Sequence, residues 1–233
     1  TSNFRAGVNA GNSIASGGTF NVAVGDESGT AITTGDHNVA VGYESLKTED
    51  AHGHNTAVGS QALKTLNAGA DGKNTAVGAF AGKLMTEGVQ NTLIGGLAGD
   101  ALTHADFNTV VGYQALSADT LGHRSTAIGY SALNAQNFAS STNSNNTAVG
   151  YHSGLSVSTG IRNTIIGSEA GDALTDADDN VAIGALALSA DRKGNKSTAI
   201  GRGALKVQDF SSSTDSNNTA VGYSAGESVT TGQ

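Results

Sequence analysis

The segment Asn55-Thr56-Ala57-Val58-Gly59 recurs along the whole chain with few changes. It returns as Asn91-Thr92-Leu93-Ile94-Gly95 and as Asn146-Thr147-Ala148-Val149-Gly150. The usual step from one copy to the next is 17 residues, which is typical of a solenoid built from stacked coils. This period argues against a compact enzyme domain. The thirteen copies begin at Asn3, Asn21, Asn38, Asn55, Asn74, Asn91, Asn108, Ser125, Asn146, Asn163, Asn180, Ser197 and Asn218.

The places of each copy are numbered here from its leading Asn or Ser. The second and fourth places are mostly β-branched, the third is mostly Ala, and the fifth is always Gly. This alternation predicts a short strand whose second and fourth side chains share one face. Both faces are expected to be buried, and the Gly is expected to need a positive φ or a close backbone approach. The leading Asn predicts an amide ladder between coils, a turn bonded to its own backbone, or both.

The eighth place is Ala or Ser, and the ninth follows the order Gly, Gly, Leu, Leu. This order predicts four-coil blocks within a single solenoid domain spanning residues 1–233. The small third and eighth places offer two flat faces, one expected inside the coil and the other against a neighbouring chain. Because the last coil stops one residue short, we expect a segment of a longer array. The blocks cover residues 3–73, 74–145, 146–217 and a partial 218–233, and matching insertions occupy 138–142 and 210–214.

Every tyrosine of the chain occupies the sixth place. Other copies carry Asp26 or Arg202 there, which a core position would not accept, so the sixth place is expected to face solvent. The row is interpreted either as a contact stripe for a partner or as rings lying flat over the turn. The candidate contact residues are Tyr43, Tyr113, Tyr130, Tyr151 and Tyr223.

The composition excludes several classes of protein. The chain has 233 residues, 5% aromatics and no Trp, which is sparse for a globule but enough for thin coils. It has no Pro, which agrees with continuous strand ladders. A net charge of −8 without a basic cluster argues against nucleic acid and anionic membranes as partners. No apolar run is long enough to predict membrane insertion of this segment.

No catalytic residue, cofactor or metal site is predicted. Acidic loop residues such as Asp100, Asp106 and Asp172 are interpreted as solvated, although loop carboxylates are also calcium ligands. A metal site formed by Asp50, His52 and His54 is the less favoured interpretation of the histidine-rich loop. No Ser, His and acid recur as a set that the sequence singles out.

The coils from Asn108 to Leu116 and from Asn218 to Gly226 carry the run Asn-Thr-(Ala/Val)-Val-Gly-Tyr. This run resembles the head repeats of trimeric autotransporter adhesins, and equally the repeat shafts of phage tail fibres, with a coil longer than is usual in the adhesin heads. The resemblance implies a left-handed parallel β-roll, a homotrimer, and adhesion to a host surface glycan or protein. It further implies an extracellular location on a cell surface or a virion.

The leading hypothesis is therefore a non-enzymatic segment of a trimeric surface fibre, giving a rigid rod and a surface of loops. One alternative is an ice-binding solenoid, because nine copies carry Thr at the second place. Against it, that Thr is expected to point inward with the Val or Ile of the fourth place. A second alternative is a fibre-borne enzyme that acts on glycans.

Overall fold

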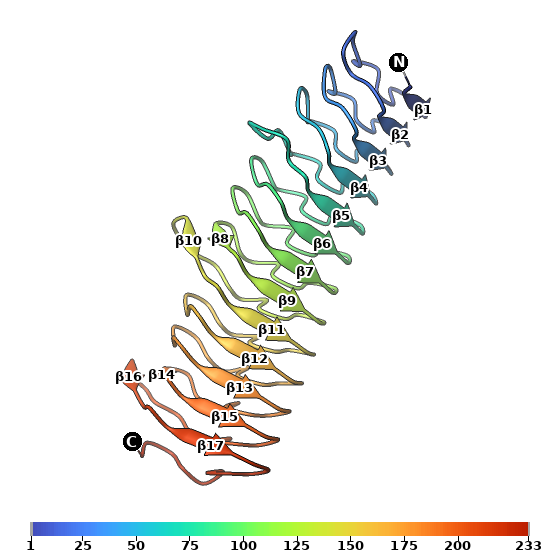
Figure 1. Cartoon of the computed structure of the whole chain (residues 1–233). Helices are drawn as coiled ribbons and strands as arrows, with labels where there is room; N and C mark the ends of the chain where they lie inside the picture. Colours follow the sequence, from blue (N-terminus) through green and yellow to red (C-terminus); the bar gives the residue numbers. More distant parts are fainter. Residues whose placement is uncertain (1, 233) are drawn as a thin grey trace. The chain divides into compact units, whose positions relative to one another are not determined.

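The computed structural model describes residues 2–232. The chain is an all-β parallel β-solenoid of about 13 turns, with one turn for each sequence copy, as the repeat predicts (Figure 1). It divides into two compact units, one ending at Tyr113 and the other beginning at Gln114.

Each coil contributes one three-residue strand, formed by the second to fourth places of its copy. Neighbouring strands within a unit pair in parallel and in register, so that Thr147 lies beside Thr164 and Val149 beside Ile166. Identical places therefore line up in rows along each unit. The first unit contains β1 (Phe4–Ala6), β2 (Val22–Val24), β3 (Val39–Val41), β4 (Thr56–Val58), β5 (Thr75–Val77), β6 (Thr92–Ile94) and β7 (Thr109–Val111). The second contains β9 (Thr126–Ile128), β11 (Thr147–Val149), β12 (Thr164–Ile166), β13 (Val181–Ile183), β15 (Thr198–Ile200) and β17 (Thr219–Val221).

The fifth place accepts only glycine, and both predicted reasons apply. Gly42 has a φ of +129°, a conformation that L side chains rarely adopt. A Cβ built on it would lie 2.6 Å from the carbonyl carbon and oxygen of Gly59 in the next coil. The backbone turns sharply here while it passes close to its neighbour, so a side chain would separate the coils.

The leading asparagines form the predicted ladder, and they also bond within their own coil. The backbone N–H of Asn38 donates to Oδ1 of Asn21 at 2.9 Å, and Asn55 does the same toward Asn38 at 3.1 Å. Meanwhile Nδ2 of Asn38 donates to the carbonyl oxygen of His52, fourteen residues further along, at 3.0 Å. Asn38 thus joins one coil to the next and closes its own coil, and Asn21 does the same through the carbonyl oxygen of Gly35.

The interior of each coil is lined by the third and eighth places, and this overturns two sequence-based expectations. Ala57 and Ala62, which hold these places in one coil, are both fully buried. The two rows face each other inside the solenoid, since Oγ of Ser28 donates to the carbonyl oxygen of Ala40 at 2.8 Å. The eighth place is therefore not a flat outer face for a neighbouring chain. Nor are both strand faces buried: the third place points inward, where Ala57, Leu93 and Ile165 are all fully buried, and the second and fourth places point outward.

The alternation of Gly and Leu at the ninth place has a packing explanation. Leu46 and its equivalents are buried and fill the interior from the ninth place. In the Gly coils the twelfth place fills it instead, and a Cβ on Gly29 would lie 2.9 Å from Cδ1 of Ile32. In most of the Gly coils a side chain at the ninth place would therefore collide with the large apolar side chain at the twelfth place. In the Leu coils the buried twelfth place carries Glu49, Asp119, Gln136, Asp191, Gln208 and, as the apolar exception, Leu66.

The two sequence insertions, 72 residues apart, fold in the same way within the second unit. Each forms a two-residue strand that pairs in parallel with the loop of the preceding coil, giving β8 (Gly122–His123) with β10 (Thr142–Asn143) and β14 (Gly194–Asn195) with β16 (Thr214–Asp215). The first residue of each insertion, Phe138 or Phe210, is buried beneath the pair.

Ser197 interrupts the asparagine ladder, and a glutamine of the same coil replaces the missing amide. Nε2 of Gln208 donates to Oγ of Ser197 at 2.8 Å. Oε1 of the same glutamine accepts from Nδ2 of Asn218 at 2.8 Å. Gln136 makes the same bonds to Ser125 and Asn146, each at 2.8 Å. The polar twelfth place therefore compensates for the Ser in the first place.

Candidate functional surfaces

The outer face of the strands carries two parallel rows, Thr or Val at the second place and Val or Ile at the fourth. Ile94 is 39% exposed and Ile166 is 37% exposed, although both are large apolar side chains. The predicted inward orientation of Val58, Ile94, Val149 and the neighbouring threonines is therefore wrong for the single chain. The alternation of the strand was predicted correctly, but the buried face is the one that carries the third place.

The threonine row presents hydroxyl groups that find no partner within the chain. Within residues 2–232, no hydrogen bond involves the hydroxyl of Thr56, Thr147 or their equivalents in the second place. From the second coil onward, neither row contains a charged residue. The face is thus an uncharged lattice of methyl and hydroxyl groups, repeated at the strand spacing of about 4.8 Å.

The five tyrosines are exposed, as the sixth place predicts. Their exposed fractions range from 47% at Tyr130 to 74% at Tyr223. In the second unit, the rings of Tyr130 and Tyr151 stack with centroids 5.5 Å apart. Nη1 of Arg202 donates to the hydroxyl of Tyr223 at 3.2 Å. The rings follow the edge of the outer face, where a partner can reach them.

Acidic side chains in the loops form hydrogen bonds and ion pairs with neighbouring coils. Oδ1 of Asp178 accepts the backbone N–H of Ile161 at 2.8 Å, one coil away. Asp179 forms a two-pronged ion pair with Arg162, at 2.6 and 2.8 Å, which lowers the pKa of its carboxyl group. These carboxylates act as bridges between coils. By contrast, Asp100 and Asp172, at equivalent places, each keep one buried oxygen without a hydrogen bond.

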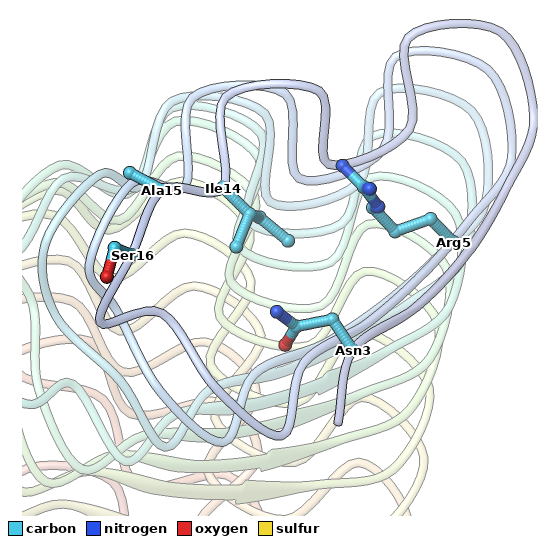
Figure 2. A pocket seen from close by; sticks show the side chains of 5 residues that line it. All are labelled: Asn3, Arg5, Ile14, Ala15 and Ser16. Atoms are coloured by element: carbon cyan, nitrogen blue, oxygen red, sulfur yellow. The ribbon is translucent and has the colours of Figure 1, made fainter. Parts of the chain in front are cut away.

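A hollow of about 310 Å³ lies over the first coil (Figure 2). Arg5 is the one charged residue that lines it, and its Nη1 donates to the carbonyl oxygen of Gly11 at 3.0 Å. The lining brings together no acid and base, so it supports no catalytic hypothesis. The lining residues are Asn3, Arg5, Ile14, Ala15 and Ser16.

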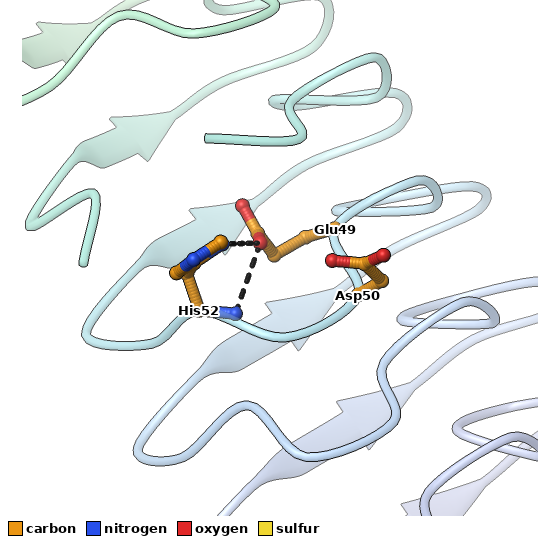
Figure 3. A group of neighbouring side chains, drawn as sticks. All are labelled: Glu49, Asp50 and His52. Atoms are coloured by element: carbon orange, nitrogen blue, oxygen red, sulfur yellow. Dashed lines mark hydrogen bonds and ion pairs between the residues drawn. The ribbon is translucent and has the colours of Figure 1, made fainter. Parts of the chain in front are cut away.

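A group of potential metal ligands gathers in the loop after β3: Glu49, Asp50 and His52 (Figure 3). Glu49 is fully buried, and burial raises the pKa of its carboxyl group. The sequence pointed to Asp50, His52 and His54 but not to Glu49. The sequence signal for Glu49 is its place in the copy. It is charged, yet it stands at the twelfth place, which is buried inside the coil in most copies. His54 instead lies 3.5 Å from Asp71, and its ring packs against the His37 ring at a tilt of 31°.

Residues 2–232 contain no helix with the length and hydropathy needed to cross a membrane. Comparisons of the chain with protein-family models, with curated proteins and with solved structures returned no match.

Proposed function

We propose that the chain is a non-enzymatic segment of a trimeric surface fibre, which acts by adhesion or receptor binding outside a cell or on a virion. The observation that carries the proposal is the uncharged outer face of the strands. Ile94, Ile166 and their equivalents form an apolar row along each unit beside the Thr row, and an exposed apolar row of this kind favours burial against a partner.

The occupant we propose for this face is further copies of the same chain. Because the rows repeat at the strand spacing, a second copy matches the first coil by coil. From the second coil onward the three-residue strands themselves carry no charged residue, and ion pairs such as Arg192 with Asp209 at 2.9 Å join successive coils through the loops. The number three comes from the resemblance to adhesin heads and tail-fibre shafts.

The loops and the tyrosine edge would then form the outer surface that meets a host glycan or protein. Tyr130 and Tyr151 supply adjacent rings with a polar end, a composition typical of recognition surfaces. Replacing both by Ser should leave the melting temperature nearly unchanged, because both rings are about half exposed. Binding to a panel of surface glycans and matrix proteins should fall if the edge is the contact.

The direct test of assembly is the mass of the chain in solution, measured by light scattering. A trimer gives three times the chain mass of 23.1 kDa. A folded monomer at micromolar concentration would remove the main support for the proposal, because the outer face would then remain in water.

The outward threonines also favour a second candidate, an ice-binding solenoid. The objection raised from the sequence, an inward Thr, no longer holds. A flat lattice of unpartnered hydroxyl and methyl groups is able to order water on its surface. Thermal hysteresis by a monomeric chain would favour this function, whereas a trimer without hysteresis would favour the fibre.

A further inference from the structure

Three buried carboxylates occupy the same place in the third coil of successive four-coil blocks: Glu49, Asp119 and Asp191. Each begins the loop that leads to the next leading Asn or Ser. The surroundings of Asp119 and Asp191 are alike, whereas those of Glu49 differ.

In the third block the carboxylate is fully enclosed by hydrogen bonds. Oδ1 of Asp191 accepts the N–H groups of Gly194 at 2.9 Å and Phe210 at 3.2 Å. Oδ2 accepts from Nε2 of Gln208 at 2.6 Å. A Cβ on Gly194 would collide with this carboxylate and would lie 2.8 Å from the Phe210 ring, so glycine is required there. Asp119 has the three equivalent partners in the second block, Gly122, Phe138 and Gln136.

In the first block, all the residues that form hydrogen bonds with the carboxylate in the other two blocks are different. Leu66 stands where the other blocks have the glutamine, and Ala68 stands in place of the phenylalanine. The space so opened admits His52 at the place of the required glycine. Among residues 2–232, Glu49 therefore keeps two long hydrogen bonds, from the N–H of His52 at 3.3 Å and from the N–H of Ala68 at 3.2 Å.

The His52 ring faces the Glu49 carboxylate at ion-pair distance but forms no hydrogen bond with it. Its Nδ1 lies 3.6 Å from Oε1, which exceeds hydrogen-bond distance, and this nitrogen is shielded from solvent with no other partner. Asp50, where the other blocks have Thr or Arg, adds a second carboxylate, and the donor atoms of all three residues lie within 4.8 Å of one another. Figure 3 shows the two carboxylates and the ring gathered around one point of the loop.

We propose that Glu49, Asp50 and His52 bind a divalent transition-metal ion, with Zn²⁺ as the best match. Two ligands on one tetrahedral zinc ion are separated by about 3.4 Å, close to the separation of Nδ1 and Oε1. An imidazole nitrogen with two carboxylates suits zinc, whereas calcium and magnesium prefer oxygen ligands alone. The three residues leave one position for water, and the ion would neutralise a carboxylate that the first block leaves poorly paired.

The test is calorimetric titration of the full chain with ZnCl₂ at neutral pH. The wild-type chain should bind one ion, and His52→Gln and Glu49→Gln should each weaken binding at least about tenfold, since even outer partners of metal ligands contribute that much. Zn²⁺ should also raise the melting temperature of the wild-type chain but not of His52→Gln. Glu49→Gln should fold, because it removes a buried charge and keeps an acceptor for both N–H groups.

The matched control is His104→Gln. His104 is exposed and lies 3.7 Å from a single carboxylate, Glu87, so this change should leave zinc affinity unaltered. The proposal is overturned if the wild-type chain shows no saturable heat. It is equally overturned if the His52 and Glu49 variants bind like the wild type, or if His104→Gln alone abolishes binding.

Discussion

The backbone N–H of Asn163 donates a hydrogen bond to the side-chain Oδ1 of Asn146, one coil earlier, at 2.9 Å. The same bond recurs between successive leading asparagines within each unit, and it holds the coils in register. The leading asparagine side chains thus join successive coils, as backbone hydrogen bonds do between the short strands.

Asn163→Ala should destabilise the chain by about 2–5 kcal/mol. The change leaves two buried groups without partners, the N–H of Asn180 and the carbonyl oxygen of Ala177. Each costs about 1–3 kcal/mol. The measurement is chemical denaturation followed by circular dichroism. Asn137→Ala, on an exposed residue, is the matched control, and equal midpoints for the two variants would contradict the role of the ladder.

Gly42→Ala should cost about 2–5 kcal/mol, because a Cβ would meet the backbone of Gly59 and the φ is positive. Gly69→Ala is the control in the same unit, since a Cβ there meets nothing within 4 Å. That change should be neutral or stabilising by about 0.4–1 kcal/mol. Thermal melting of the two variants compares the sites directly, and similar melting temperatures would refute the close approach of the coils.

Val149→Asp should abolish assembly but preserve the fold, because the side chain points outward from β11 into the proposed interface. Light scattering should report a single chain with an unchanged far-ultraviolet spectrum. Ala148→Asp is the counterpart, since Ala148 is fully buried and a charge there should unfold the coil. If Val149→Asp unfolds the chain as Ala148→Asp does, the assignment of the two strand faces is wrong.

Glu44 should contribute stability that disappears in acid. Ion pairs with Lys47 and Lys64, each at 2.7 Å, lower the pKa of its carboxyl group from 4.5 to about 2. Because this pKa is lower in the folded state, the contribution is complete above about pH 4.5 and is lost as the pH falls toward 2.

The difference in melting temperature between wild type and Glu44→Gln should therefore shrink over that pH range. Glu87→Gln, on an exposed side chain, is the control. A difference that stayed constant from neutral pH to pH 2.5 would show that the lysine pairs contribute nothing.

The candidate sites were predictable to different degrees. The exposure of Tyr130 and Tyr151 followed from Asp26 and Arg202 at the same place of other copies. The meeting of Glu49 with His52 did not, since it depends on the room left by Leu66 and Ala68 in the next coil. Nineteen residues separate Glu49 from Ala68 along the chain, and only stacking brings them together.

The sequence alone determined the period, the position of every three-residue strand and the requirement for glycine after it. These follow from local rules, because β-branched alternation and a positive φ act within a few residues. Only the tertiary structure decided which strand face lies inside. An alternation with a period of two defines two strand faces, but it does not say which face lies inside the coil. The choice depends on which side of the strand the rest of the coil closes over. Here the coil closes over the third place, whether it is Ala57 or the larger Ile165, and leaves Val58 on the outer side.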